Sequence, residues 1–118
     1  MNASLQVLCV GGPPPDLSGS AWGPFAVATC ATLDEAAALL RTRTPEALLL
    51  ALPEPAVVVG WSALSHAVLD AAVVAVLPQP SAALATQLLQ LGLQDVLPDL
   101  SPEPLARALR LAVERKAL

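Results

Sequence analysis

The sequence has few of the side chains that carry most protein chemistry. Among its 118 residues there are one histidine, two cysteines, one phenylalanine and no tyrosine, and only 14% of the residues are charged. Six lysines and arginines stand against ten acidic residues, so the net charge is -4. Because nucleic acids are bound through clustered basic side chains, this balance argues against a nucleic-acid partner.

The histidine and the cysteines form no pattern typical of a catalytic or metal site. Cys9 and Cys30 lie in apolar runs at no metal-ligand spacing, which predicts buried free thiols. His66 has no second ligand near it in the sequence, and the acidic residues are scattered. Since no nucleophile–base pair, paired carboxylates or metal cluster can be assembled from them, we expect neither an enzyme nor a metal or other cofactor.

Long hydrophobic segments are also absent, although 55% of the residues are hydrophobic. No run approaches the roughly 18–20 apolar residues that cross a bilayer, and the first residues lack the basic start of a signal peptide. We therefore expect a cytoplasmic protein that does not insert into membranes. Its length suits a single domain, and so few charges predict an unusually apolar surface.

The apolar runs that are present have the length of strands. Residues 45–53 hold an uninterrupted aliphatic run between Pro45 and Pro53. Such a run is typical of a strand covered on both faces, at the centre of a parallel sheet. Similar runs predict further strands at residues 5–10, 25–29, 71–77 and 93–97.

Helical signals separate most of these runs. Thr32 and Glu35 form a capping box that opens a helix over residues 32–40, and Ser81 caps another that runs to about Leu91. Ser101 is expected to cap a final helix that continues to the last residue. Between the third and fourth strands, residues 57–59 are three valines that favour a strand, and a helix is expected from about Trp61.

The segment after the first strand is different. Residues 13–24 are rich in Pro, Gly and Ser, which predicts a loop or at most one helical turn instead of a full crossover helix. Gly11 and Gly12 could cradle a phosphate, but the three prolines that follow them lack the N–H donors that such a loop presents.

Two stretches together with this alternation resemble a known family. Pro45–Pro53 and Gly92–Leu105 are similar to the Pro-Asp-Leu-Val-Leu-Leu-Asp-Leu and Gly-Ala-Asp-Asp-Tyr-Leu patterns of bacterial response regulator receiver domains. The resemblance covers almost the whole chain. It implies an α/β fold, namely a flavodoxin-like doubly wound sheet of five parallel strands in the order 2-1-3-4-5, here with the first helix shortened.

The resemblance also implies where phosphorylation chemistry would lie, and this chain lacks it there. The family's acidic pair falls on Gly11 and Gly12, its phosphoacceptor aspartate on Ala51, and its lysine on Asp99. Its hydroxyl residue falls on Leu77 or Pro78, and its switching aromatic on Val96. The expected function is therefore a non-phosphorylatable receiver-like module of two-component or related bacterial signalling, acting by protein–protein interaction. The alternative is a small-molecule or nucleotide-binding α/β regulatory domain, with its ligand near Gly11 and Gly12.

The expected partner is a protein, either a second copy or a signalling partner. In receivers the last two helices and the strand between them usually form the dimer surface, and the resemblance implies that this face serves here. The interface candidates are Leu84, Leu88, Leu91, Val96, Leu105, Leu109 and Ala112. We also expect residues 1–118 to form one domain whose last helix continues into a downstream domain, because that helix shows no stop signal.

Overall fold

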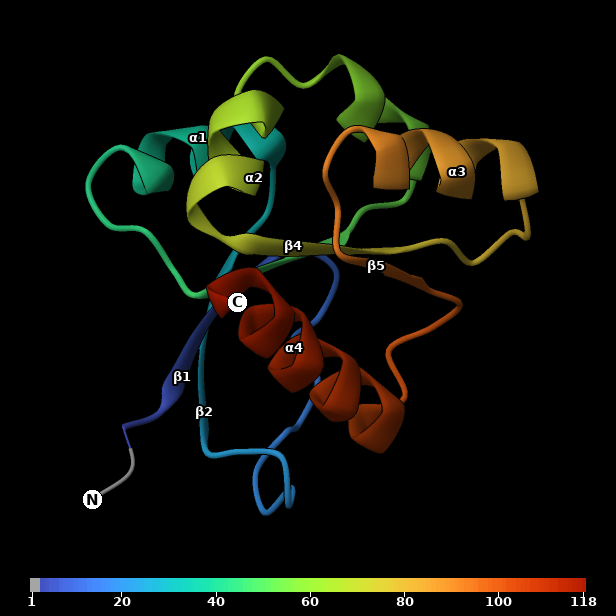
Figure 1. The fold of residues 1–118 in the computed structure, drawn as a ribbon. Helices are drawn as coiled ribbons and strands as arrows, with labels where there is room; N and C mark the ends of the chain where they lie inside the picture. Colours follow the sequence, from blue (N-terminus) through green and yellow to red (C-terminus); the bar gives the residue numbers. More distant parts are fainter. Residues whose placement is uncertain (1–2) are drawn as a thin grey trace.

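A parallel β-sheet forms the centre of the molecule in a computed structural model, which describes residues 3–118 (Figure 1). Its five strands lie in the order β2-β1-β3-β4-β5, and every neighbouring pair is parallel. The flavodoxin-like topology predicted from the sequence is therefore confirmed. The strands are β1 (Leu5–Gly11), β2 (Phe25–Cys30), β3 (Ala47–Ala51), β4 (Ala72–Val76) and β5 (Asp95–Leu97).

The two faces of the sheet are covered unequally (Figure 1). Helices α1 (Leu33–Leu40), α2 (Leu64–Asp70) and α3 (Ala82–Gln90), with the short 3-10 helix η1 (Pro55–Gly60), cover one face. The other face is covered by α4 (Pro102–Ala117) and by Leu17 of the loop between β1 and β2. Alternate strand positions supply both cores, since successive side chains of a strand point to opposite faces. Leu48 and Leu50 face the first layer, whereas Ala47 and Leu49 face α4.

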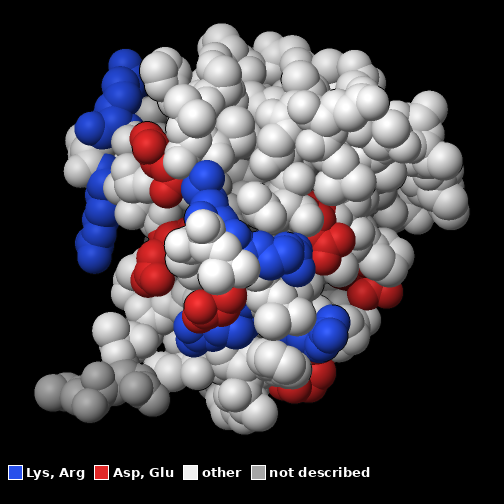
Figure 2. Space-filling model, viewed as in Figure 1, with Lys and Arg blue, Asp and Glu red and all other residues white. Residues whose placement is uncertain are grey.

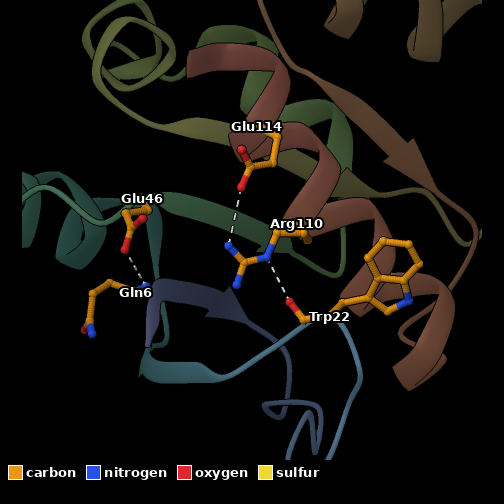
Figure 3. A network of polar contacts seen from close by, with 5 residues as sticks. All are labelled: Gln6, Trp22, Glu46, Arg110 and Glu114. Carbon is orange, nitrogen blue, oxygen red and sulfur yellow. Dashed lines mark hydrogen bonds and ion pairs between the residues drawn. The ribbon is translucent and has the colours of Figure 1, made fainter. Parts of the chain in front are cut away.

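The chain between β1 and β2 has no helix, as the sequence predicted. Arg110 of α4 holds this loop in place: its Nε donates a hydrogen bond of 2.8 Å to the carbonyl oxygen of Trp22 (Figure 3). The Arg110 guanidinium also lies 6.0 Å from the ring centroid of Phe25, and that of Arg107 lies 5.8 Å from the ring of Trp22. Such cation–π contacts add to the hydrogen bond, so α4 anchors the loop that covers the sheet where a first helix would pack.

Two of the predicted helix caps are confirmed. The Thr32 hydroxyl accepts a hydrogen bond of 3.1 Å from the backbone N–H of Glu35, and the Ser81 hydroxyl accepts one of 3.1 Å from Leu84. The stop after α3 is also as predicted, because Gly92 has a φ of +110° that other residues rarely adopt.

Ser101 occupies the N-cap position of α4, as predicted, but its side chain accepts no capping hydrogen bond. An N-cap side chain normally accepts from the second or third helical residue. In α4 the third residue is Pro104, which has no N–H, and Pro102 removes another unsatisfied donor. The carboxylate of Asp99 instead accepts a hydrogen bond of 2.9 Å from the N–H of Ser101 and so orders the turn before the helix.

The segment after β3 differs from the prediction at its start. The valines at residues 57–59 belong to η1, and α2 begins at Leu64 instead of Trp61. Trp61 has an extended backbone conformation, and its side chain is only 8% exposed, in the core beneath the helices. Burial of this ring interrupts the helical path. A helix prediction based on local preference does not detect this interruption.

Candidate functional site

The carboxyl ends of the strands bring the predicted site positions together. Gly11 at the end of β1 lies opposite Ala51 at the end of β3 in the sheet register. Ligands of open α/β sheets bind just beyond such strand ends. At this edge, however, Gly11, Gly12 and Ala51 offer neither a carboxylate nor a hydroxyl.

The backbone at Gly11 leaves no space for a side chain. Its φ is +101°, and a Cβ added there would lie 2.6 Å from the Ala51 carbonyl oxygen and 3.0 Å from Cδ2 of Leu52. A Cβ added at Gly12 would lie 3.2 Å from the same oxygen and 3.3 Å from the Ala51 methyl group. The ends of β1 and β3 therefore pack directly on one another, where an acidic pair would need room.

The ends of β4 and β5 are apolar as well. Leu77 follows β4 and is buried, and Pro78 follows it on the surface. Val96 lines a hollow of about 310 Å³ whose other lining groups include Leu77, Pro98 and Ala85. These are the positions where the resemblance placed a hydroxyl and a switching aromatic, and here they form aliphatic packing.

Two acidic residues that follow these strands, Asp16 and Asp99, are engaged in local turns. Oδ1 of Asp16 accepts hydrogen bonds of 2.6 Å from the Ser18 hydroxyl and 3.0 Å from its N–H. Hydrogen bonds from Ser18 and Ser101 lower the pKa of Asp16 and of Asp99, respectively. Both carboxylates are fully exposed. Over residues 3–118, no three His, Cys, Asp or Glu side chains are grouped as they would be around a metal ion.

The two cysteines are free thiols, as predicted. Cys9 is fully buried in the core beneath α4, and Cys30 is partly buried. Burial raises the pKa of both thiols, and the nearby Glu35 carboxylate adds to the effect at Cys30. A raised pKa reduces the thiolate fraction, so neither side chain is activated as a nucleophile.

The structure corrects most of the predicted interface. Leu88, Leu105, Leu109 and Ala112 have no exposed surface and lie in the two cores. Helical spacing marks an apolar stripe, but here that stripe packs on the sheet and is not available to a partner. Of the remaining candidates, Leu84 and Val96 are half-buried, and Leu91 is 40% exposed.

A different surface is apolar and exposed. It is formed by α3 and η1, which contact each other, and we call it the uncharged face. Val57 is 46% exposed there, Leu89 48% and Leu91 40%. The surface over these elements, at the upper right of Figure 2, shows no charged residue. The sequence carried this signal, because Asp70 is its only Lys, Arg, Asp or Glu between Pro55 and Gln94.

No helix among residues 3–118 is long and apolar enough to cross a membrane.

Comparisons with known proteins identify the fold. No family model and no curated protein sequence matches this chain. The signal receiver domain of a LuxO repressor protein from Vibrio parahaemolyticus is similar in structure, with a TM-score of 0.73 and 19% identity over 98% of this chain and 94% of that one. A CpaE2 pilus assembly protein from Sinorhizobium meliloti 1021 is similar over 95% of this chain and 99% of that one, with a TM-score of 0.67 and 16% identity. The chain therefore has the fold of a signal receiver domain.

Proposed function

We propose that this domain is a receiver-like module of a bacterial signalling protein, that it is not phosphorylated, and that it acts in the cytoplasm through contacts with other proteins. The observation that carries this proposal is the direct packing of Gly11 and Gly12 on Ala51 at the carboxyl edge of the sheet.

Phosphorylation of a receiver needs a carboxylate that accepts the phosphoryl group and a metal ion held by several oxygen ligands. The methyl group of Ala51 cannot form an acyl phosphate, and glycine has no side-chain oxygen. The space for acidic side chains is missing as well, since the Ala51 carbonyl group at the end of β3 lies where a Cβ at Gly11 would be. A receiver fold without the residues for phosphoryl transfer favours a role in recognition of other proteins.

The two similar structures fit such a role. One is named as a signal receiver domain of a repressor and the other as a pilus assembly protein, so this fold is used within quite different proteins. For the present chain, we infer a compact module that other protein segments contact.

The uncharged face is the surface that we propose for these contacts. The protein carries a net charge of -4, so two copies repel one another over most orientations. A twofold contact through α3 and η1 brings no like charges together and covers Val57, Leu89 and Leu91. We therefore propose a homodimer through this face, in place of the face formed by α3, β5 and α4.

Treatment with acetyl phosphate and Mg²⁺ is expected to leave the mass of the intact protein unchanged. Beryllofluoride with Mg²⁺ is expected to leave its melting temperature unchanged, because Gly11, Gly12 and Ala51 carry no carboxylate. The Ala51→Asp variant is also expected to remain unlabelled, since positioning the phosphoryl donor needs the metal ligands and the lysine as well. Stoichiometric labelling of the wild-type protein, lost on replacing one aspartate, would refute the proposal.

The Leu89→Glu variant is expected to shift the dimer to monomer in sedimentation velocity at concentrations where the wild type dimerises. A charge on both copies meets its equivalent across a twofold contact and is desolvated there. Leu69→Glu is the matched control, because Leu69 on α2 is 71% exposed and lies outside the uncharged face. A wild type that is monomeric up to millimolar concentration, or a dimer equally sensitive to both variants, contradicts this interface.

A further inference from the structure

One hollow of the molecule lies away from the carboxyl edge, between α1 and α2. Its volume is about 560 Å³, within the range of roughly 300–1,000 Å³ typical of small-molecule sites. The methyl groups of Ala63, Ala67 and Ala71 line one side of it, and Ala37 and Leu40 of α1 line the other. We call this hollow the α1–α2 groove. Its apolar lining suits the carbon skeleton of a ligand.

Polar side chains from α2 and the turn before it gather along the same groove. Ser62, His66 and Asp70 all line it. His66 and Asp70 are four residues apart and so lie on one side of α2, and Ser62 lies in the turn before the helix. His66 is the only histidine of the chain, and Asp70 is the only charged residue between Pro55 and Gln94. The only histidine of the chain and the only charged residue of this segment therefore line the same hollow.

The end of α1 supplies a charge of the opposite sign. Arg41 follows the last residue of α1 and also lines the groove, with Thr44 of the next turn. Within residues 3–118, neither Arg41 nor Asp70 forms a salt bridge, since the ion pair found there joins Arg110 and Glu114. Their hydrogen-bonding groups are therefore free to bind a ligand.

We propose that the α1–α2 groove binds a small zwitterion of the α-amino acid class. Arg41 pairs with the carboxylate, Asp70 accepts hydrogen bonds from the ammonium group, and the side chain lies on the alanine lining. A ligand with only a negative charge is repelled by Asp70, and one with only a positive charge is repelled by Arg41. The hydroxyl groups of Ser62 and Thr44 and the ring of His66 supply further hydrogen-bond partners on the rim.

The test is an NMR titration of the ¹⁵N-labelled protein with glycine, L-alanine, L-valine and L-leucine. We expect saturable amide shifts, largest in α1, α2 and the turn at Thr44, for at least one of these amino acids. For the amino acid that binds, its analogues without the ammonium or without the carboxylate group are expected to bind about tenfold more weakly or worse, because each leaves one charge unpaired.

Matched variants locate the site. Arg41→Gln and Asp70→Asn are each expected to weaken binding by about tenfold or more. Arg43→Gln and Asp34→Asn remove equal charges from α1 and its following turn without touching the groove, and they are expected to leave the affinity unchanged. The absence of saturable shifts for all four amino acids, equal binding of the singly charged analogues, or equal effects of the control variants would overturn the proposal. None of these results depends on phosphorylation or on dimer formation, so the two proposals fail independently.

Discussion

The Gly11→Ala variant is expected to lose at least about 3 kcal/mol of its free energy of unfolding. An alanine at a φ of +101° is strained, and its Cβ would lie 2.6 Å from the Ala51 carbonyl oxygen. The two nearest atoms belong to the backbone of Ala51 in β3, so the overlap is relieved only when β1 and β3 separate at the centre of the sheet. Urea unfolding followed by circular dichroism measures the loss.

Gly19→Ala is the matched control for this experiment. Gly19 also has a positive φ, +77°, but a Cβ added there meets no atom within 4 Å. It therefore reports the conformational strain alone, which we expect to cost about 1 kcal/mol. Equal losses in the two variants would show that the strand ends are not closely packed.

This result bears directly on the proposed function. An aspartate at residue 11 has the same Cβ as an alanine, so rebuilding the acidic pair of a phosphorylated receiver first disrupts the sheet. In the function that we propose, the absence of phosphorylation would thus follow from the backbone as well as from the side chains at Gly11, Gly12 and Ala51.

The Leu88→Ala variant is expected to lose about 2–5 kcal/mol of its free energy of unfolding, and Leu89→Ala less than about 0.5 kcal/mol. Leu88 has no exposed surface and packs in the core between the sheet and its helices, whereas Leu89 is 48% exposed on the uncharged face. The truncation at residue 88 leaves a cavity, and the one at residue 89 removes a side chain that is half in water.

Thermal and urea unfolding at a dilution where the protein is monomeric measures this difference. In sedimentation experiments the order is expected to be reversed, with the substitution at residue 89 acting on the dimer. A folded, stable Leu88→Ala protein that has lost its dimer would restore Leu88 as an interface residue and contradict the core assignment.

Local patterns determined the five strands and most of the helices along the chain, and the strand order in the sheet was implied by the resemblance to receiver domains. The apolar runs placed all five strands. For β1, β3 and β4 the reason is that such segments are buried on both faces of a parallel sheet, whereas β2 and β5 are partly exposed edge strands. Thr32, Ser81 and Gly92 marked helix ends through bonds and dihedral angles that involve only their neighbours. The missing hydroxyl and carboxylate groups at Gly11, Gly12 and Ala51 needed no structure either, since they follow from residue identity.

The tertiary structure alone decided which surfaces remain open. Helical spacing showed that α3 and α4 each have an apolar stripe, but it could not tell whether a sheet or a partner covers Leu88 or Leu109. Residues far apart in the chain create the packing of Gly11 on Ala51 and the approach of Arg41 to the groove that Asp70 lines. These features depend on distances across the fold, and the local sequence pattern carries no information about such distances.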